Sequence, residues 1–467
     1  MEKPLRFIRA ASGVHVVAVM TRPAPCPGKC TFCPTASDTP KSYLPDSPVP
    51  LRARRNGYDP YRQTAGRLKV YLENGHVVSK VEVVVMGGTF TALPHDYREW
   101  FVANIYKALN DYPNWREAAA HGVDLETEQL RNETAEVRLV ALTIETRPDY
   151  IDRGEVDHLL KLGVTRVELG VQTLDEEVLR RVKRGHGVGE VVYATQLLKD
   201  SAYKVCYHLM PGLPGSDPDR DLEIVKEVFT NPDYKPDCVK IYPLYVVPGT
   251  ELYEDWRRGL YKSYDEETWL ELLAKIYATV PRWARVMRLG RDIPLHHVVA
   301  GPKFGNMRQV VLNYMEKLGL DCVEIRCREV GVKIANSRPV APGPIEIKKH
   351  LYEASRGVEI FLEATGPDDT LYGILRLRLP HAPHRPELAK AALVRELHVY
   401  GPAVPVGSRG IWWQHEGVGR RLMEKAEEIA AGQGLFKIAV ISGVGAREYF
   451  KKLGYSRCGP YMCKEAA

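Results

Sequence analysis

Short apolar runs alternate with segments of helical period along the first half of the chain. The runs are dense in Val and Ile, as expected of strands that are buried on both faces. They lie at residues 14–20, 80–88, 137–146, 164–173, 203–212 and 238–247. Amphipathic segments such as DEEVLRRVKRG, residues 175–185, separate them. Six repeats of strand and helix predict an α/β fold, a parallel sheet curled into a partial (βα)6 TIM-like barrel whose chemistry sits at the carboxyl ends of the strands.

The pattern changes after RPVAPGPIEI, residues 338–347, which is rich in Pro and Gly. A helix is expected after a third strand of this second half. The strands are expected at residues 357–365, 370–379, 394–401 and 437–443. This order predicts a smaller α+β domain. We therefore expect a barrel domain over 1–320, a linker over 321–347 and an α+β domain over 348–467.

Composition narrows the class of protein. A chain of 467 residues with 45% hydrophobic and 27% charged residues fits a globular protein of two or three domains. No apolar stretch reaches the length of a membrane span, and the N-terminal residues do not resemble a signal peptide. Nine cysteines without an export signal favour a reducing cytoplasm and metal chemistry. The net charge of +6 permits a nucleic-acid partner without establishing one.

Three cysteines follow the first predicted strand within eight positions. Cys26, Cys30 and Cys33 have C-x3-C-x2-C spacing, and Phe32 precedes the last of them. Three thiolates on a short loop can hold three irons of a 4Fe-4S cluster and leave the fourth iron open to a small molecule. A partial zinc site or chance clustering is the alternative. The position at the predicted catalytic end of the barrel favours the cluster.

This loop resembles the signature of the radical S-adenosylmethionine (SAM) superfamily. The resemblance implies that SAM binds the open iron and is cleaved to methionine and a 5′-deoxyadenosyl radical. It also implies that the turn MGGTF, residues 86–90, binds the amino group of SAM through its backbone. The residues of that turn are Gly87, Gly88 and Thr89, and the two glycines allow a close backbone approach.

Polar residues end two later strands, in TIETRPD and ELGVQT. Carboxyl-end positions would turn their side chains toward the barrel mouth. Structural salt bridges would explain any one of them as well. The residues concerned are Glu145, Arg147, Glu168 and Gln172.

The second half has a glycine loop at the start of a predicted helix, in WQHEGVGRRLMEKAEEIA, residues 413–430. Backbone N–H groups of such a loop, together with the helix N-terminus, can bind a pyrophosphate. The order of strand, loop, helix and strand resembles the GNAT acetyltransferase fold, which implies that acetyl-CoA binds here. The implied acetyl-CoA residues are Gln414, Gly417, Val418 and Gly419 in the loop, and Glu396, Leu397, His398 and Val399 in the strand beside the pantetheine arm.

A tyrosine late in this domain is the candidate catalytic residue. In REYFKKLGY, Phe450 stands where many GNAT enzymes have the tyrosine that protonates the CoA thiolate. Tyr449 lies beside it and is expected to face the thioester. Simple packing of Tyr449 is the alternative.

The two signatures in one chain resemble the family of the catalytic subunit of Elongator, in a prokaryotic form without the long N-terminal extension. The stretches that carry the resemblance include RARRNGYDPYRQTAGRL, RWARVMRLGRDIP, HEGVGRRLMEKAE and IAVISGVGAREYFKKLGYSRCGPYM. The resemblance implies modification of the wobble uridine, position 34, in a tRNA anticodon stem-loop. A hydrogen is removed from the acetyl methyl group, the carbon adds to uridine C5, and thioester hydrolysis leaves 5-carboxymethyluridine.

The same resemblance implies an electron donor for the cluster and no membrane partner, and it leaves a homodimer open. The alternative function is a protein lysine acetyltransferase whose cluster is only structural. The intact MGGTF turn argues against it, because a structural cluster needs no SAM site.

Two basic segments are candidate tRNA contacts. In the first, guanidinium groups lie near Tyr58 and Tyr61, a combination suited to phosphates and unstacked bases. Its basic residues are Arg52, Arg54, Arg55, Arg62, Arg67 and Lys69. In the second, arginines recur at every third position, which predicts a drifting stripe on a helix. They are Arg282, Arg285, Arg288 and Arg291. A solvated face is the alternative for both.

A second metal site is suggested by DCVEIRCRE, residues 321–329. Cys322 and Cys327, with Glu324 between them, resemble a stretch of prokaryotic family members in which three cysteines bind zinc. A carboxylate can replace a thiolate as a zinc ligand. The spacing is loose, and two buried thiols are the alternative.

Overall fold

Seven parallel strands form the first sheet, and they lie side by side in sequence order. The computed structural model describes residues 12–401 and 417–465. The strands are β1 (His15–Met20), β2 (Lys80–Met86), β3 (Arg138–Thr146), β4 (Arg166–Gln172), β5 (Lys204–Leu209), β6 (Cys238–Ile241) and β7 (Arg285–Leu289). The sheet is curled, and its edge strands β1 and β7 do not pair with each other, so the barrel is open. The predicted partial barrel is confirmed, with one strand more than expected.

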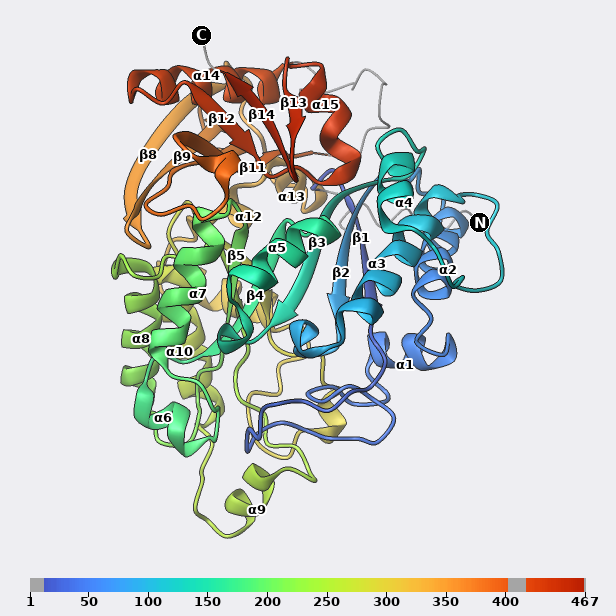
Figure 1. Ribbon diagram of the computed structural model, residues 1–467. Helices are drawn as coiled ribbons and strands as arrows, with labels where there is room; N and C mark the ends of the chain where they lie inside the picture. Colours follow the sequence, from blue (N-terminus) through green and yellow to red (C-terminus); the bar gives the residue numbers. More distant parts are fainter. Residues whose placement is uncertain (1–11, 402–416, 466–467) are drawn as a thin grey trace.

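The helices between residues 48 and 335 are α1 (Pro48–Arg55), α2 (Pro60–Glu73), α3 (His95–Asn110), α4 (Leu125–Asn132), α5 (Arg153–Leu162), α6 (Glu176–Arg181), α7 (Val188–Asp200), α8 (Pro218–Thr230), α9 (Glu251–Arg257), α10 (Glu266–Thr279), α11 (Met307–Lys317), α12 (Ile325–Arg328) and α13 (Val330–Ala335). Several of them, such as α3, α5, α7 and α8, cover the outer face of the sheet, whereas α9 lies beyond the carboxyl ends of the strands (Figure 1). No helix among the described residues is both long and apolar enough to cross a membrane.

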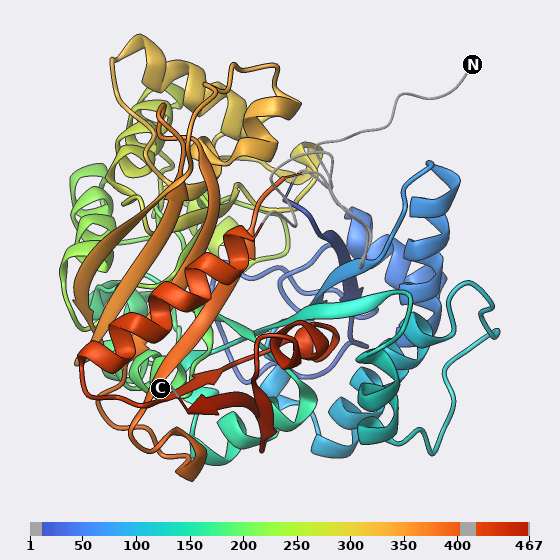
Figure 2. The ribbon, with the colours of Figure 1, turned by 90° about the horizontal axis from the view of Figure 1, so that it is seen from above.

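A second sheet of seven strands forms the other domain, in the order β13-β14-β12-β11-β10-β9-β8. Its strands are β8 (Glu346–Ala354), β9 (Gly357–Thr365), β10 (Leu371–Leu379), β11 (Ala391–Val399), β12 (Lys437–Val440), β13 (Ser456–Cys458) and β14 (Tyr461–Glu465). The helices are α14 (Val418–Gly432) and α15 (Arg447–Lys451). Seen from above, α14 lies on the outer face of this sheet (Figure 2), where Leu422, Met423 and Ala426 are buried. The α+β prediction is confirmed, with β8, β13 and β14 added.

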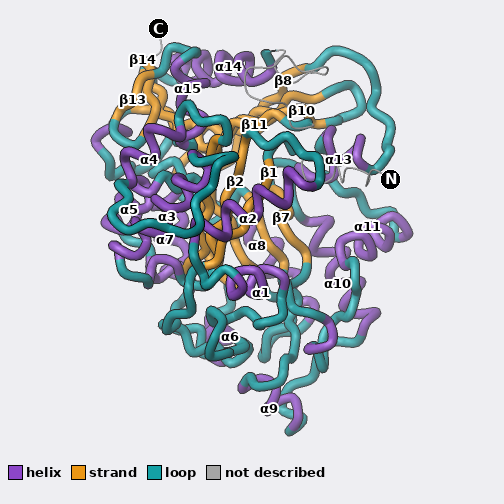
Figure 3. The backbone as a smooth tube through the Cα atoms, turned by 90° about the vertical axis from the view of Figure 1, so that its right-hand side faces the viewer, coloured by secondary structure: helices purple, strands orange, loops and turns teal. Residues whose placement is uncertain are grey.

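The second domain packs against the amino ends of the barrel strands (Figures 1 and 3). A Cβ atom on Gly443 would lie 2.0 Å from the carbonyl oxygen of Val140, in the first half of β3, so only glycine fits this contact. Lys204, the first residue of β5, forms an ion pair with Glu396 of β11. The carboxyl ends of the strands therefore point away from the second domain.

Four of the nine cysteines form disulfides, Cys322 with Cys327 and Cys458 with Cys463. This corrects the expectation that the cysteines serve metal chemistry alone. The second pair bridges the short hairpin of β13 and β14, in which Cys458 lies opposite Tyr461. Cys26, Cys30 and Cys33 are not disulfide-bonded.

Candidate functional site

The loop after β1 carries three cysteines into one cavity at the carboxyl end of the barrel. Cys26, Cys30 and Cys33 all line this cavity, whose volume is about 350 Å³. They come from one short loop, so their thiols converge without any contribution from distant segments. Three unpaired thiols on one wall suit three irons of a cluster, whereas a structural zinc site bound by thiolates normally has four protein ligands.

The cysteine loop is fixed by its neighbours. Phe32 is 5% exposed and packs in an apolar cluster with Val182. The backbone N–H of Thr31 donates to the carbonyl oxygen of Val182 at 3.1 Å, and Leu252 N–H donates to the carbonyl oxygen of Thr31 at 2.9 Å. Segments that follow β4 and β6 therefore hold the loop in place.

The thiols have positive and polar neighbours. Arg184 Nη1 donates to Cys30 Sγ at 3.5 Å, and Gly28 N–H donates to Cys26 Sγ at 3.4 Å. Burial, with the neighbouring Cys30 sulfur, raises the pKa of Cys33 to about 11. Iron binding needs thiolates, so assembly of a cluster must release the proton of Cys33. The positive charges of Arg291 and Lys41 favour the thiolate that results.

The predicted glycine turn lies opposite the cysteines. Gly88 and Thr89 line the cavity. Gly87 has φ 137°, and a Cβ atom there would lie 2.0 Å from Thr21 Oγ1. A side chain at this position would therefore push β2 away from β1 and reshape the cavity wall.

The cavity extends from the mouth down the inside of the barrel. Its wall includes Glu82 and Val16 near the amino ends of β2 and β1, and Arg166 at the start of β4. It therefore reaches from the cysteines toward the face on which the second domain packs. Arg147 and Gln172, which were expected at the mouth, also line it.

A charged network lies in the middle of this cavity. Lys240 forms ion pairs with Glu168 and with Glu145, the latter at 3.2 Å. His208 Nε2 is 2.9 Å from a carboxylate oxygen of Glu168. The hydroxyl of Tyr43 donates to Glu145 at 2.6 Å. All five side chains line the cavity.

The charges of this network are stabilised in place. Burial disfavours ionisation of Glu168, but Lys240, His208 and Arg166 hold its pKa well below the usual range. Burial also opposes the positive charge on Lys240, but the attraction of Glu168 is the larger effect. The pKa of Lys240 is therefore raised. Burial and the adjacent Glu145 raise the pKa of Tyr43, which remains a hydroxyl donor at neutral pH.

Sequence reasoning had placed Glu145 and Glu168 at the mouth but missed their partners. His208 is the one basic residue in YHLMPG, and Lys240 is the one basic residue in CVKIY. A single charge in a strand buried on both faces was the available signal. Tyr43 lies in a loop and offered no such signal.

In the second domain, the predicted acetyl-CoA loop ends at the start of α14. Gly417 has φ 89° and α14 begins at Val418. A Cβ atom on Gly419 would lie 2.7 Å from the Tyr449 hydroxyl oxygen. The structure thus brings Tyr449 to the first turn of the helix, where the predicted pyrophosphate loop ends. Gln414 lies outside the described residues.

The predicted pantetheine strand has an edge without a neighbouring strand. β11 pairs with β12 only from Ala391 to Val394, so the four residues from Glu396 to Val399 have no described partner on β12. The contact of these four residues with the pantetheine arm stays a prediction. Glu396 and His398 also contact the barrel domain, through Lys204 and through the carbonyl oxygen of Ser12 at 2.7 Å.

Tyr449 and Phe450 point in different directions. Phe450 is 5% exposed and belongs to the core of the second domain, whereas Tyr449 is 40% exposed. Partial burial of the hydroxyl raises the pKa of Tyr449 to about 12. Tyr449 is therefore a protonated hydroxyl beside the glycine loop, and its catalytic role stays a prediction.

The first basic segment forms α1, α2 and the turn between them. Arg55, Arg62 and Lys69 are exposed. Arg54 forms an exposed ion pair with Asp38 at 2.5 Å. Arg52 Nη1 donates to the carbonyl oxygen of Pro48 at 3.1 Å.

The aromatic side chains of this segment contact other groups of the protein. Tyr61 is fully buried and donates to Asp111 at 3.0 Å, so its predicted role as a base-stacking ring is wrong. Tyr58 donates to the carbonyl oxygen of Asp38. The Arg67 guanidinium lies 4.4 Å from the Tyr71 ring centre and Lys69 Nζ 5.4 Å from that of Trp115. Arginine and lysine here already contact rings of the protein itself.

The second basic segment is not a helical stripe. Its middle forms β7, which pairs with β6, and Arg282 and Arg291 lie just outside this strand. Arg282 bonds to Glu363 and Asp369 of the second domain, and Arg285 is 8% exposed and pairs with Glu329 at 2.7 Å. Arg288 and Arg291 line the cavity instead.

The predicted zinc residues are close together. Cys322, Cys327 and Glu324 have ligand atoms within 4.8 Å of one another. The two sulfurs form a disulfide, and buried Glu324 accepts from Tyr277 at 3.0 Å and from Val286 N–H at 3.2 Å. This arrangement leaves no thiolate for a metal, and zinc binding stays a prediction for the reduced pair.

Comparison with known proteins agrees with this architecture. A family model of the radical SAM superfamily matches residues 24–228, and one of the radical SAM C-terminal domain matches residues 236–317. A "tRNA uridine(34) acetyltransferase" of Methanocaldococcus infernus is 48% identical over 99% of this chain and 87% of its own length. The "Elongator complex protein 3" of Saccharomyces cerevisiae is 43% identical over 98% of this chain and 84% of its own. The chain belongs to the family of the Elongator catalytic subunit.

A solved structure supports this family assignment for both domains. The archaeal Methanocaldococcus infernus Elp3 with an N-terminal deletion superposes with a TM-score of 0.85 at 45% identity, covering 97% of this chain and 99% of that one. This member of the Elongator family is accordingly an enzyme of the radical SAM superfamily. Its three cysteines and Gly88 and Thr89 of the glycine turn line the same cavity, and their roles as ligands of a cluster and of SAM stay predictions.

Proposed function

We propose that this enzyme converts the wobble uridine of tRNA to 5-carboxymethyluridine with acetyl-CoA and SAM. The observation that carries the proposal is the cavity that runs from the three cysteines, past the charged network, toward the second domain. The relatives named for tRNA uridine(34) acetyl transfer and for Elongator support the substrate.

Cys26, Cys30 and Cys33 would hold a 4Fe-4S cluster, and Gly88 and Thr89 would contact SAM bound to it. When bound, the cluster would give one electron to SAM and so supply a 5′-deoxyadenosyl radical, which would remove a hydrogen atom from the acetyl methyl group. The methyl carbon would then add to uridine C5. The adduct would lose the C5 proton and return one electron to the oxidised cluster, and hydrolysis of the thioester would leave the carboxymethyl group.

The charged network would orient the acetyl thioester in the cavity. Lys240, which lines the cavity and is paired with two carboxylates, would donate a hydrogen bond to the thioester carbonyl oxygen. A buried cation has a larger effect on such an oxygen than an exposed one, because little water competes. Tyr43 sets the orientation of Glu145 through its 2.6 Å hydrogen bond.

The binding of acetyl-CoA is assigned to the second domain. The backbone N–H groups at the start of α14 suit a pyrophosphate. The free edge of β11 suits the amide groups of a pantetheine arm, because the backbone groups of an unpaired strand edge can bond to them. Tyr449 lies between these two features and the solvent.

Acetyl-CoA deuterated at the methyl group tests the proposal directly. The reconstituted enzyme is incubated anaerobically with SAM, reductant, tRNA and the labelled acetyl-CoA, and 5′-deoxyadenosine is analysed by mass spectrometry. Deuterium in 5′-deoxyadenosine and carboxymethyluridine in the tRNA are expected together. Unlabelled 5′-deoxyadenosine, or acetyl-lysine as the sole product, would exclude it and favour the alternative protein acetyltransferase.

A further inference from the structure

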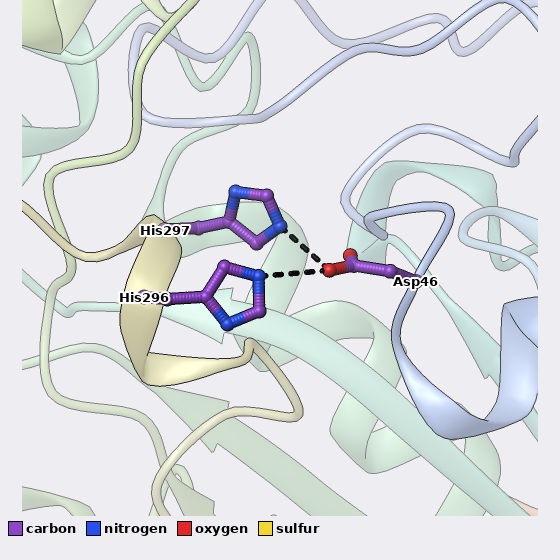
Figure 4. Close-up of side chains that lie close together, drawn as sticks. All are labelled: Asp46, His296 and His297. Carbon is purple, nitrogen blue, oxygen red and sulfur yellow. Dashed lines mark hydrogen bonds and ion pairs between the residues drawn. The ribbon is translucent and has the colours of Figure 1, made fainter.

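Three metal-binding side chains meet at the rim of the barrel mouth, from segments about 250 positions apart (Figure 4). Asp46 precedes α1, and His296 and His297 belong to the short 3-10 helix Leu295–His297 after β7. His296 Nε2 is 3.0 Å and His297 Nε2 2.7 Å from the same oxygen, Asp46 Oδ2. The side chains are 67%, 36% and 44% exposed for His296, His297 and Asp46.

The backbone that carries these side chains is held by other contacts. Ser47 Oγ donates to the carbonyl oxygen of Asp292 at 2.7 Å. Arg291 Nη2 donates to the carbonyl oxygen of Ser42 at 2.9 Å. The two contacts flank Asp46 on one segment and precede the histidines on the other, so the segments are held together next to the cluster before any ion binds.

The spacing of the ligand atoms fits a tetrahedral ion. Zinc bonds of about 2.0–2.2 Å to imidazole nitrogen and carboxylate oxygen place neighbouring ligand atoms roughly 3.3 Å apart. The observed separations of 3.0 and 2.7 Å would need to open by about 0.3 and 0.6 Å, respectively. Two imidazoles and one carboxylate are a preferred ligand set for Zn²⁺.

We propose that Asp46, His296 and His297 form a Zn²⁺ site with water as the fourth ligand. The site is separate from the cysteines of the cavity and from the pair Cys322 and Cys327, and it does not depend on the proposed reaction. β1 and β7 are the unpaired edges of the open barrel, and the ligands come from segments that follow each of them. The ion would therefore link the two edges at the mouth.

A second cluster of the same composition provides the matched control. His95, Glu155 and His158 also have ligand atoms within 4.8 Å of one another. There, Glu155 is held by Arg98 and His158 by Glu99 at 3.2 Å, so the ligands are already engaged. A His95→Gln variant should bind zinc as the wild type does.

The experiment measures zinc in the reconstituted holoenzyme, after loosely bound metal is removed with a chelating resin. One zinc per chain is expected, with only nitrogen and oxygen neighbours in the zinc K-edge X-ray absorption spectrum. Asp46→Asn and the double variant His296→Gln/His297→Gln should each bind zinc at least about tenfold more weakly, since losing a direct ligand costs no less than losing a supporting contact.

Thermal unfolding gives a second readout. Zinc should raise the melting temperature of the wild type and of His95→Gln, because it binds only the folded state, and should leave the double variant unchanged. Equal zinc content in the wild type and the double variant, or sulfur neighbours in the spectrum, would overturn the proposal. In that case the cluster is a hydrogen-bonded contact between the two loops.

Discussion

The molecule has two buried ionic networks that look alike in composition but differ in what surrounds them. At the interface of the domains, Arg395 bonds to Asp237 at 2.8 Å and to Glu359 at 2.8 Å, and Arg378 bonds to Asp200 at 2.8 Å. All of these side chains are at most 2% exposed. In the barrel, Glu168 is also buried and the Lys240 side chain is 12% exposed, but both line a cavity of about 350 Å³.

The difference separates structural charges from those available to a ligand. In the interface network, Asp237 faces several bases: burial opposes its ionisation, but Arg395, Lys199 and Arg376 hold its pKa well below the usual range. In the barrel network, the cavity can admit water or a substrate beside the same kind of ion pair. Burial and charge therefore do not identify a functional site, whereas an adjoining cavity does.

The largest effect should follow removal of the cysteines from the cavity. Replacing Cys26, Cys30 and Cys33 together with Ala removes every predicted iron ligand of that loop. The absorption near about 400 nm typical of thiolate-bound iron and all 5′-deoxyadenosine formation should disappear. The interface network is untouched, so the urea midpoint should stay close to that of wild-type protein lacking its cluster. A triple variant that still assembles a full cluster would contradict the assignment.

The interface network should control stability. Asp237→Ala leaves Arg395 buried with one carboxylate partner fewer. We therefore expect the free energy of unfolding to fall by about 3–5 kcal/mol in urea titrations. Because the folded pKa of Asp237 is lowered, its contribution is complete above the ordinary value near about 4 and is lost as the pH falls through the lower folded value. The gap between wild type and variant should therefore persist at pH 5–7 and narrow only in strong acid. A constant gap would mean that Asp237 acts by packing.

The barrel network should control activity more than stability. Lys240→Met removes the proposed donor to the thioester, and loss of one such buried donor costs roughly 100–1,000-fold in rate. Water in the cavity can solvate the carboxylates left behind, so the loss of unfolding free energy should be smaller than for Asp237→Ala. Carboxymethyluridine formation and urea unfolding measure the two quantities. A Lys240→Met protein that is fully active but equally destabilised would make this network structural as well.

The same contrast explains what sequence patterns could and could not predict. Strands such as β2 and β3 are continuous Val- and Ile-rich runs, so the barrel was predictable. β7 was missed because Arg285 lies in it, and the partner that permits its burial, Glu329, is 44 positions further along the chain. Tyr61 was misassigned for the same reason, since its partner Asp111 is distant in sequence.

The second domain shows that a strand can also be missed because its sequence is polar. β8 is an edge strand whose Lys348 and Lys349 are exposed, so it has the polar composition of a linker. The three cysteines and the glycine turn were predictable because all their spacing lies within one loop. Lys240 and Tyr43 come from distant segments, and only folding of the chain brings their side chains together.

An intermediate effect should follow a block of the glycine loop. Gly417→Glu places a bulky, negative side chain at a residue with φ 89°, beside the predicted pyrophosphate site. Acetyl-CoA affinity measured by calorimetry should fall at least about tenfold, since one such contact is worth about 1.4 kcal/mol or more. A Gly432→Glu variant at the other end of α14 is the control. Unchanged affinity of Gly417→Glu would mean that the loop is only a helix start.

The smallest effect should come from the exposed basic segment beside the mouth. Replacing Arg52, Arg54 and Arg55 with Ala removes up to three phosphate contacts. Each contact with single-stranded RNA contributes roughly −0.7 to the slope of log affinity against log salt, so the slope should become shallower by up to about 2 units. The ion pair of Arg54 with Asp38 is exposed and contributes little stability. Acetyl-CoA affinity and cluster content should therefore not change.

A charge-matched control decides whether position or net charge is responsible. Lys348, Lys349 and Lys390 are exposed in the second domain, and replacing them with Ala removes the same three charges. If tRNA binding depends on the site, only the arginine variant should bind more weakly and with a shallower slope. If both variants weaken binding equally, general attraction of a basic protein would explain the effect. If neither does, the RNA contact must lie elsewhere, and Arg288 and Arg291 in the cavity wall would be the next residues to replace.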